Sequence, residues 1–188
     1  MTQAPQRPDV VDVLTNDHHE VLDLLEQAKA SDDAGERREL ADVAISELVR
    51  HSVAEEMFVY PVMREQLPDG DEAVASDVSE HKELETIMKK LEGADPQHAE
   101  FDDLLLQLEA ALRGHVRDEE GLQFPYLRAQ IAHSELVELA EKVELAKRVA
   151  PTRPHPLAPN NQLFHKVVGP GVGMVDRIRD ALSDRRTS

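Results

Sequence analysis

The sequence predicts an all-α protein: an up-down-up-down four-helix bundle with a short fifth helix and a proline-rich C-terminal tail. From Asp9 to about Arg148 the chain is rich in Ala, Leu, Glu and Lys, and apolar residues return every three or four positions, which is typical of amphipathic helices. The segments SDDAG, LPDG and GADP interrupt this pattern and mark turns. The second half of the pattern also repeats the first.

These breaks give the expected bounds of each helix. The first helix should span 9–30, the second 34–66 and the third 71–91. The fourth should span 96–131, because Pro96 suits the first turn of a helix, and a fifth at 134–148 should pack outside the bundle. We therefore expect a disordered N-terminus at 1–8, a bundle domain at 9–150 and a tail at 151–188 with a short amphipathic helix at 172–182.

Composition excludes several kinds of chemistry. The 188 residues include no cysteine, so a metal would have to bind through His, Asp or Glu. The chain begins without an apolar signal segment and contains no run of about 18 apolar residues, which predicts a cytoplasmic protein. A formal net charge of -17 disfavours nucleic acid and anionic membranes as partners, favours cations near the surface and leaves a basic partner open. Nothing in the sequence fixes the oligomeric state.

The internal repeat locates the candidate chemistry. HSVAEEMFVYPVMREQ begins at His51 and HVRDEEGLQFPYLRAQ at His115, and both read His, three residues, Glu-Glu, then aromatic-Pro, Arg and Gln. The preceding helices match too, since DHHEVLDLL contains His18 and EHKELETIM contains His81. The chain is thus predicted to be a duplicated helical hairpin, and two hairpins packed about a pseudo-twofold axis would direct one histidine per helix toward a common centre.

Helical spacing then assigns faces. His18 shares its face with leucines and valines whereas His19 does not, so His18 should point inward. Glu55 lies four residues after His51, and Glu119 lies four residues after His115. Glu119 is preferred over its neighbour Glu120 because it repeats Glu55. The candidate metal ligands are His18, His51, Glu55, His81, His115 and Glu119.

Buried carboxylates need a partner, because an unpaired one costs several kcal/mol. A single His and Glu pair at this spacing is usually a satisfied core pair, but the duplicated set favours two divalent metal ions bridged by the glutamates. Six protein ligands would leave positions open for a bridging oxygen and an incoming small molecule. Histidine and carboxylate donors suit iron, manganese and zinc alike.

With these motifs placed, residues 10–131 resemble the hemerythrin-like family, also called the hemerythrin HHE cation-binding domain, in its actinobacterial type. The resemblance implies a four-helix bundle with an oxo- or hydroxo-bridged di-iron centre that handles oxygen, peroxide, nitric oxide or iron. It suggests peroxide disproportionation, as in a catalase, or iron oxidation. Two alternatives are a module that senses oxygen, nitric oxide or iron without turnover, and a protein that buffers iron.

Some positions depart from the oxygen-carrying members of that family. Those members have two histidines four apart on the third helix, where this chain has Asp77 before His81 and Glu85 after it. Asp77 or Glu85 could complete the coordination. Tyr126 falls on the face of His115 and could bind iron or hydrogen-bond peroxide, whereas Tyr60 falls opposite His51 and should be structural. Pro61 and Pro125 should kink their helices near the site.

Overall fold

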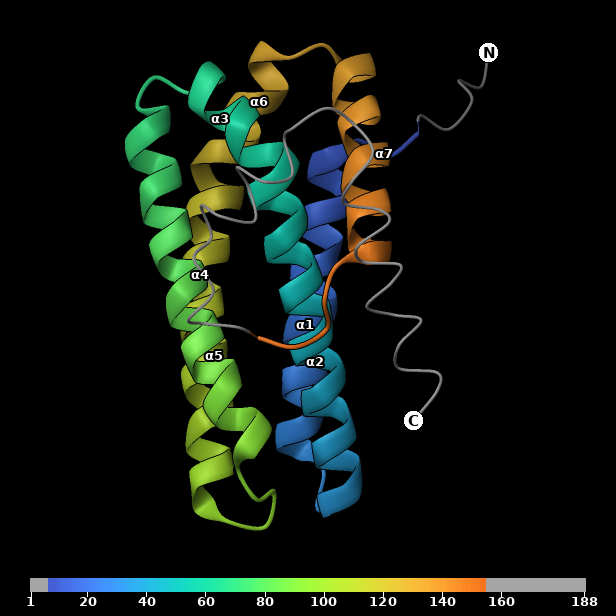
Figure 1. Ribbon diagram of the computed structural model, residues 1–188, viewed down its shortest axis with the longest axis vertical. Helices are drawn as coiled ribbons and strands as arrows, with labels where there is room; N and C mark the ends of the chain where they lie inside the picture. The colour runs from blue at the N-terminus through green and yellow to red at the C-terminus, as the bar shows by residue number, and fades with distance from the viewer. Residues whose placement is uncertain (1–6, 155–188) are drawn as a thin grey trace.

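The architecture is a four-helix bundle with a fifth helix on one side, seen in a computed structural model that describes residues 7–154 (Figure 1). Its first hairpin pairs α1 with α2, and its second pairs α4 with α5. These four long helices run along the bundle, and each carries one of the four candidate ligand histidines. Their bounds are α1 Val10–Ala30, α2 Ala34–Ala54, α4 Gly70–Gly93 and α5 Ala99–Asp118.

Local sequence explains where these helices begin and end. Asp9 caps α1, accepting a hydrogen bond from the backbone N–H of Asp12 while the Asp12 side chain accepts from the N–H of Asp9. Gly70 opens α4 at a point where a Cβ atom would lie 2.5 Å from the carbonyl oxygen of Met63, so only glycine fits. The prediction that the fourth helix begins at Pro96 was wrong: residues 96–98 form a turn, and α5 begins after the N-cap residue His98.

The second helix of each hairpin is interrupted by one π-helical turn. α2 continues through a π-helical turn, η1 (Glu55–Val59), into α3 (Tyr60–Gln66), and α5 continues through η2 (Glu119–Gln123) into α6 (Phe124–Gln130). Pro61 and Pro125 come directly after these turns, and a proline can neither donate a helical hydrogen bond nor tolerate the carbonyl four residues before it. A π-turn accommodates such a residue by adding one position, which rotates α3 and α6 by about 100° relative to an unbroken helix.

The apolar core divides into two clusters with a polar layer between them. One cluster joins the four long helices and includes Leu25, Leu48 and Leu108. The other includes Leu14 and Phe124 and extends to α7 (His133–Val149), which packs on α1 and α2 beside the bundle (Figure 1). Along each long helix, the candidate ligand lies between residues of the two clusters.

Two further expectations concern the ends of the chain and its environment. The amphipathic helix expected at 172–182 and most of the N-terminal segment at 1–8 lie outside the described residues. Within residues 7–154, no helix combines the length and apolar character that crossing a membrane requires.

Candidate metal centre

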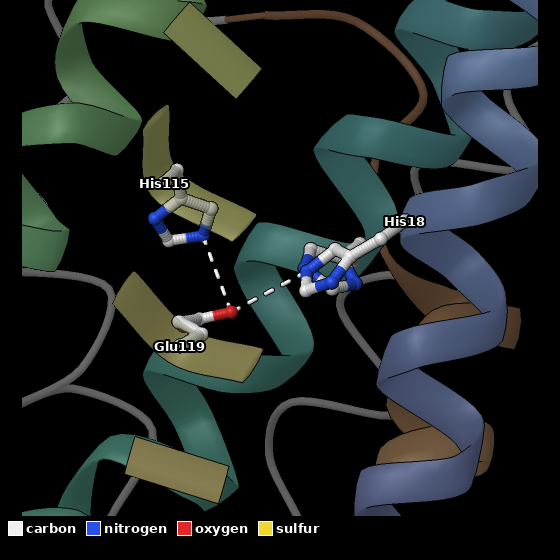
Figure 2. A group of neighbouring side chains, drawn as sticks. His18, His115 and Glu119 are labelled. Atoms are coloured by element: carbon white, nitrogen blue, oxygen red, sulfur yellow. Dashed lines mark hydrogen bonds and ion pairs between the residues drawn. The ribbon is translucent and has the colours of Figure 1, made fainter. Parts of the chain in front are cut away.

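Six side chains from four helices converge in the polar layer. His18 comes from α1, His51 and Glu55 from the α2 and η1 junction, His81 from α4, and His115 and Glu119 from the α5 and η2 junction. Each is at most 2% exposed. Figure 2 shows His18 and His115 directed from different helices toward the same carboxylate oxygen of Glu119. The six residues singled out by the sequence repeat therefore lie together in the interior.

The histidines form two pairs that the glutamates connect. The rings of His18 and His51 have centroids 4.7 Å apart at 61°, and those of His81 and His115 have centroids 4.8 Å apart at 61°. The two pairs are thus related by the pseudo-twofold symmetry of the hairpins.

Each glutamate offers one oxygen to a histidine of each pair. Glu55 Oε2 lies 3.1 Å from Nε2 of His51 and 3.4 Å from Nε2 of His81. Glu119 Oε2 lies 3.3 Å from Nε2 of His18 and 3.5 Å from Nε2 of His115. This arrangement gathers imidazole and carboxylate donors closely enough to bind a metal, in the overlapping groups His18, His51, His115, Glu119 and Glu55, His81, His115.

Several central atoms have no hydrogen-bond partner among the described residues. Both oxygens of Glu55, Oε2 of Glu119 and Nε2 of His115 are completely buried without a well-directed hydrogen bond. Leaving such atoms unsatisfied would cost about 1–3 kcal/mol each, and more for a charged oxygen. Bound metal would satisfy all of them at once, so the donor set fits a metal site.

An outer ring of four carboxylates orients the imidazoles. The Nδ1 atom of each histidine faces a carboxylate oxygen, at 2.8 Å for His18 and 2.9 Å for His115. Donation of the Nδ1 proton outward leaves the lone pair of Nε2 facing the centre, which is the tautomer that binds metal. The four pairs are His18 with Glu120, His51 with Asp17, His81 with Glu56, and His115 with Glu80.

Sequence reasoning passed over these four outer carboxylates, although the repeat contains them. Glu56 and Glu120 each come directly after a candidate ligand glutamate, and Asp17 and Glu80 each precede a candidate ligand histidine. Their recurrence in both copies was the signal that could have identified them.

The charges of the centre shift its pKa values strongly. Burial lowers the pKa of His51, but the nearby carboxylates of Glu55 and Asp17 outweigh it and raise the pKa to about 10. His81 behaves in the same way beside Glu55 and Glu56, with a pKa of about 9. Burial raises the pKa of Glu55, but the two histidines lower it well below its ordinary value. Protons therefore hold the place of cations in the metal-free centre, and a metal must displace them.

The structure corrects the assignment of the two tyrosines. Tyr60 is 1% exposed, and its hydroxyl lies 3.1 Å from Nε2 of His81 and 3.4 Å from Oε1 of Glu119. Tyr126 is half-buried, and no contact described for residues 7–154 joins it to the cluster. The expectation assumed an unbroken helix after His51 and His115, whereas the π-turns rotate Tyr60 toward the centre and Tyr126 away from it.

The two acidic residues around His81 are placed differently. Asp77 is 1% exposed, and one of its oxygens lies within 4.8 Å of a ring nitrogen of His115. Burial and the charge of Glu119 raise the pKa of Asp77 to about 7. Glu85 is half-buried and lies outside the groups of potential metal ligands found among the described residues. The structure thus brings Asp77, but not Glu85, to the centre.

Two known proteins have sequences similar to this chain. An uncharacterized hemerythrin-like protein of Schizosaccharomyces pombe is 28% identical over 174 residues, which is 92% of this chain and 86% of the yeast protein. A DNA nickase of Nostoc is 28% identical over 149 residues, 78% of this chain but only 42% of the nickase.

A solved structure shares the fold. It is that of a hemerythrin HHE cation-binding domain protein from Mycobacterium kansasii, with a TM-score of 0.67, 20% identity, and coverage of 92% of this chain and 99% of that one. Residues 9–127 match the family model of the hemerythrin HHE cation-binding domain, which spans the bundle and all six central side chains. The chain belongs to the hemerythrin HHE cation-binding domain family.

Proposed function

We propose that this protein holds a pair of iron ions in the centre and uses them to disproportionate peroxide or to oxidise iron. The observation that carries the proposal is the set of buried donor atoms without hydrogen bonds on Glu55, Glu119 and His115, surrounded by imidazoles whose Nε2 atoms face inward. The four histidines would hold the ions together with Glu55 and Glu119, whose carboxylates each lie near two of the imidazoles. Manganese or zinc would fit the same donor types.

The protein side chains define what the bound pair can do. Six ligands shared by two ions leave coordination positions for a small molecule, and an iron pair supplies the two-electron redox chemistry that peroxide requires. The inner glutamates and the ring of outer carboxylates place much negative charge around the pair, which favours the ferric state and weakens reversible oxygen binding. The buried aromatic rings of Tyr60 and Phe124 exclude water from the centre.

Catalase-like turnover has a direct test. Two molecules of hydrogen peroxide give one of oxygen and two of water, so iron-loaded protein given peroxide under anaerobic conditions should evolve oxygen at half the rate of peroxide loss. Ferrous iron added in air should be oxidised faster than in buffer if iron oxidation is the activity. A Glu55→Ala, Glu119→Ala double variant, which lacks both bridging groups, is the matched control. Iron-loaded protein that does neither would contradict the proposal.

If the protein binds the iron pair but turns over neither peroxide nor ferrous iron, the alternative is a sensing or iron-buffering role. The formal charge of -17 opposes the DNA backbone, so the name of the Nostoc relative suggests no nucleic-acid chemistry for this chain. We expect a small molecule as the partner.

A further inference from the structure

The pseudo-twofold symmetry of the centre is broken in the layer next to it. The repeat pairs Asp77 with Leu14, since 77 − 14 equals the offset of 63 between His81 and His18. It pairs Gln123 with Val59, since 123 − 59 equals the offset of 64 between His115 and His51. Thus one hairpin has hydrocarbon where the other has a carboxylate and an amide.

The apolar side lies against His18, one member of the first histidine pair. The ring of Phe124 stacks on His18 with centroids 6.0 Å apart and planes within 3°. Leu14 and Val59 are completely buried in the same apolar cluster as Phe124. These side chains offer no hydrogen bond, so a polar molecule entering this half would lose the hydrogen bonds it makes in water.

The polar side lies over the pair formed by His81 and His115. Asp77 approaches His115 within 4.8 Å, and Gln123 Nε2 donates a 3.1 Å hydrogen bond to Asp77 Oδ1. This leaves two buried acceptors, Asp77 Oδ2 and Gln123 Oε1, without a partner among the described residues. Buried acceptors of this kind cost about 1–3 kcal/mol each unless a donor reaches them.

We propose that the external molecule is taken on the His81 and His115 half of the centre, where Asp77 and Gln123 select one that donates hydrogen bonds, as hydrogen peroxide does. This inference rests on the proposed function and narrows its substrate. Hydrogen peroxide carries two O–H donors for two free acceptors, whereas oxygen and nitric oxide carry none. Asp77 and Gln123 are thus specificity residues for protic ligands.

The repeat itself supplies the test variant. Asp77→Leu with Gln123→Val gives the second hairpin the residues that the first already buries at the matching positions. In the iron-loaded double variant we expect two irons per chain, a KM for peroxide raised at least about tenfold, a smaller change in kcat, and unchanged affinity of the reduced protein for nitric oxide. Leu14→Met with Val59→Ile alters the packing of the apolar half without changing its polarity, and it should leave all four values unchanged.

Different outcomes would refute the role of Asp77 and Gln123 and the proposed function. An unchanged peroxide KM in the double variant, or an equal loss of peroxide and nitric oxide affinity, would overturn the selection by Asp77 and Gln123. Loss of one iron would overturn it too, because Asp77 would then be a metal ligand. Asp77→Asn keeps the side-chain shape and repeats the test should the double variant fold poorly. Wild-type protein that binds no metal pair, or leaves peroxide unchanged, would instead refute the proposed function.

Discussion

Lys147 on α7 donates a hydrogen bond to one oxygen of Asp17 on α1, and the other oxygen of Asp17 lies 3.4 Å from Nδ1 of His51. The fifth helix thus reaches the centre through a single buried carboxylate. The matching residue in the second hairpin, Glu80, has 29% of its side chain exposed and accepts a 3.4 Å hydrogen bond from the hydroxyl of Ser76. The two halves of the centre therefore differ in how firmly a histidine is oriented.

Replacing Lys147 should weaken one metal position and spare the other. In Lys147→Met, Asp17 would lose the charge that fixes it, so metal affinity should fall, by less than the roughly 10- to 100-fold typical of losing a direct partner such as Asp17. Titration of the metal-free protein with cobalt(II), followed by visible absorption, would resolve the two binding steps. Lys142→Met on the exposed side of α7 is the control. Two unchanged steps in Lys147→Met would show that α7 does not act on the centre.

Tyr60 and Tyr126 form a matched pair of tests for the π-turns. Tyr60→Phe removes a buried hydroxyl that contacts His81 and Glu119, so the visible spectrum of the iron-loaded protein should shift. Tyr126→Phe removes a half-buried hydroxyl away from the cluster and should leave the spectrum unchanged. A spectral shift in Tyr126→Phe but not in Tyr60→Phe would contradict the π-turns and support uninterrupted helices, which place Tyr126 at the centre.

The tyrosines also show where sequence reasoning stopped. The bundle and the six central residues could be predicted from helical periodicity and from the repeat, because both depend on spacing over one or two turns. The register beyond Glu55 and Glu119 could not be predicted in this way, since one extra residue in a turn moves every later side chain. Pro61 and Pro125 indicated a disturbance, but the choice of a π-turn over a kink depends on tertiary packing.

Longer-range partners were equally beyond the sequence pattern. The contact between Lys147 and Asp17 joins residues far apart in the chain. Helical periodicity predicts which side of its own helix each residue occupies, but not which residue of another helix it contacts. The turn at Pro96 likewise depends on a contact with another hairpin, because Arg37 on α2 donates a 2.8 Å hydrogen bond to the Pro96 carbonyl.

The metal-free protein should lose stability as the pH rises from neutral to alkaline. The folded pKa values of His51 and His81, about 10 and about 9, exceed the ordinary value of 6.5. Their contribution is therefore fully present below pH 6.5 and is lost as the pH passes through 9 to 10. The lowered pKa of Glu55 has the opposite effect on stability. Its contribution to stability is present above pH 4.5 and is lost as the pH falls through the lowered pKa.

Thermal melts with and without a chelator would check this pH dependence. The metal-free Tm should be highest between the ordinary pKa values of glutamate and histidine, 4.5 and 6.5, and fall toward pH 10. Metal-loaded protein should gain stability over the same alkaline range, because metal and protons compete for the imidazoles. A metal-free Tm that stays level up to pH 10 would contradict the charge arrangement.

Asp9 should be a major support of the end of the bundle where α1 begins. It caps α1 and accepts hydrogen bonds of 2.9 and 2.8 Å from the guanidinium of Arg128 on α6. Asp9→Ala removes the helix cap and the contact with Arg128, so the free energy of unfolding should fall by about 1–3 kcal/mol in urea titrations. Asp33→Ala, which removes a cap of α2 that lacks such an arginine among its described contacts, should cost about 1 kcal/mol. Equal losses in the two variants would show that the arginine contact adds nothing.

Anomalous diffraction at the iron edge from crystals of the iron-loaded protein tests the central claim most directly. We predict two iron peaks per chain, roughly 3.5–4 Å apart, one beside His18 and His51 and the other beside His81 and His115, with Glu55 and Glu119 touching both. A single peak, or iron bound elsewhere while the six side chains keep their metal-free contacts, would contradict the account.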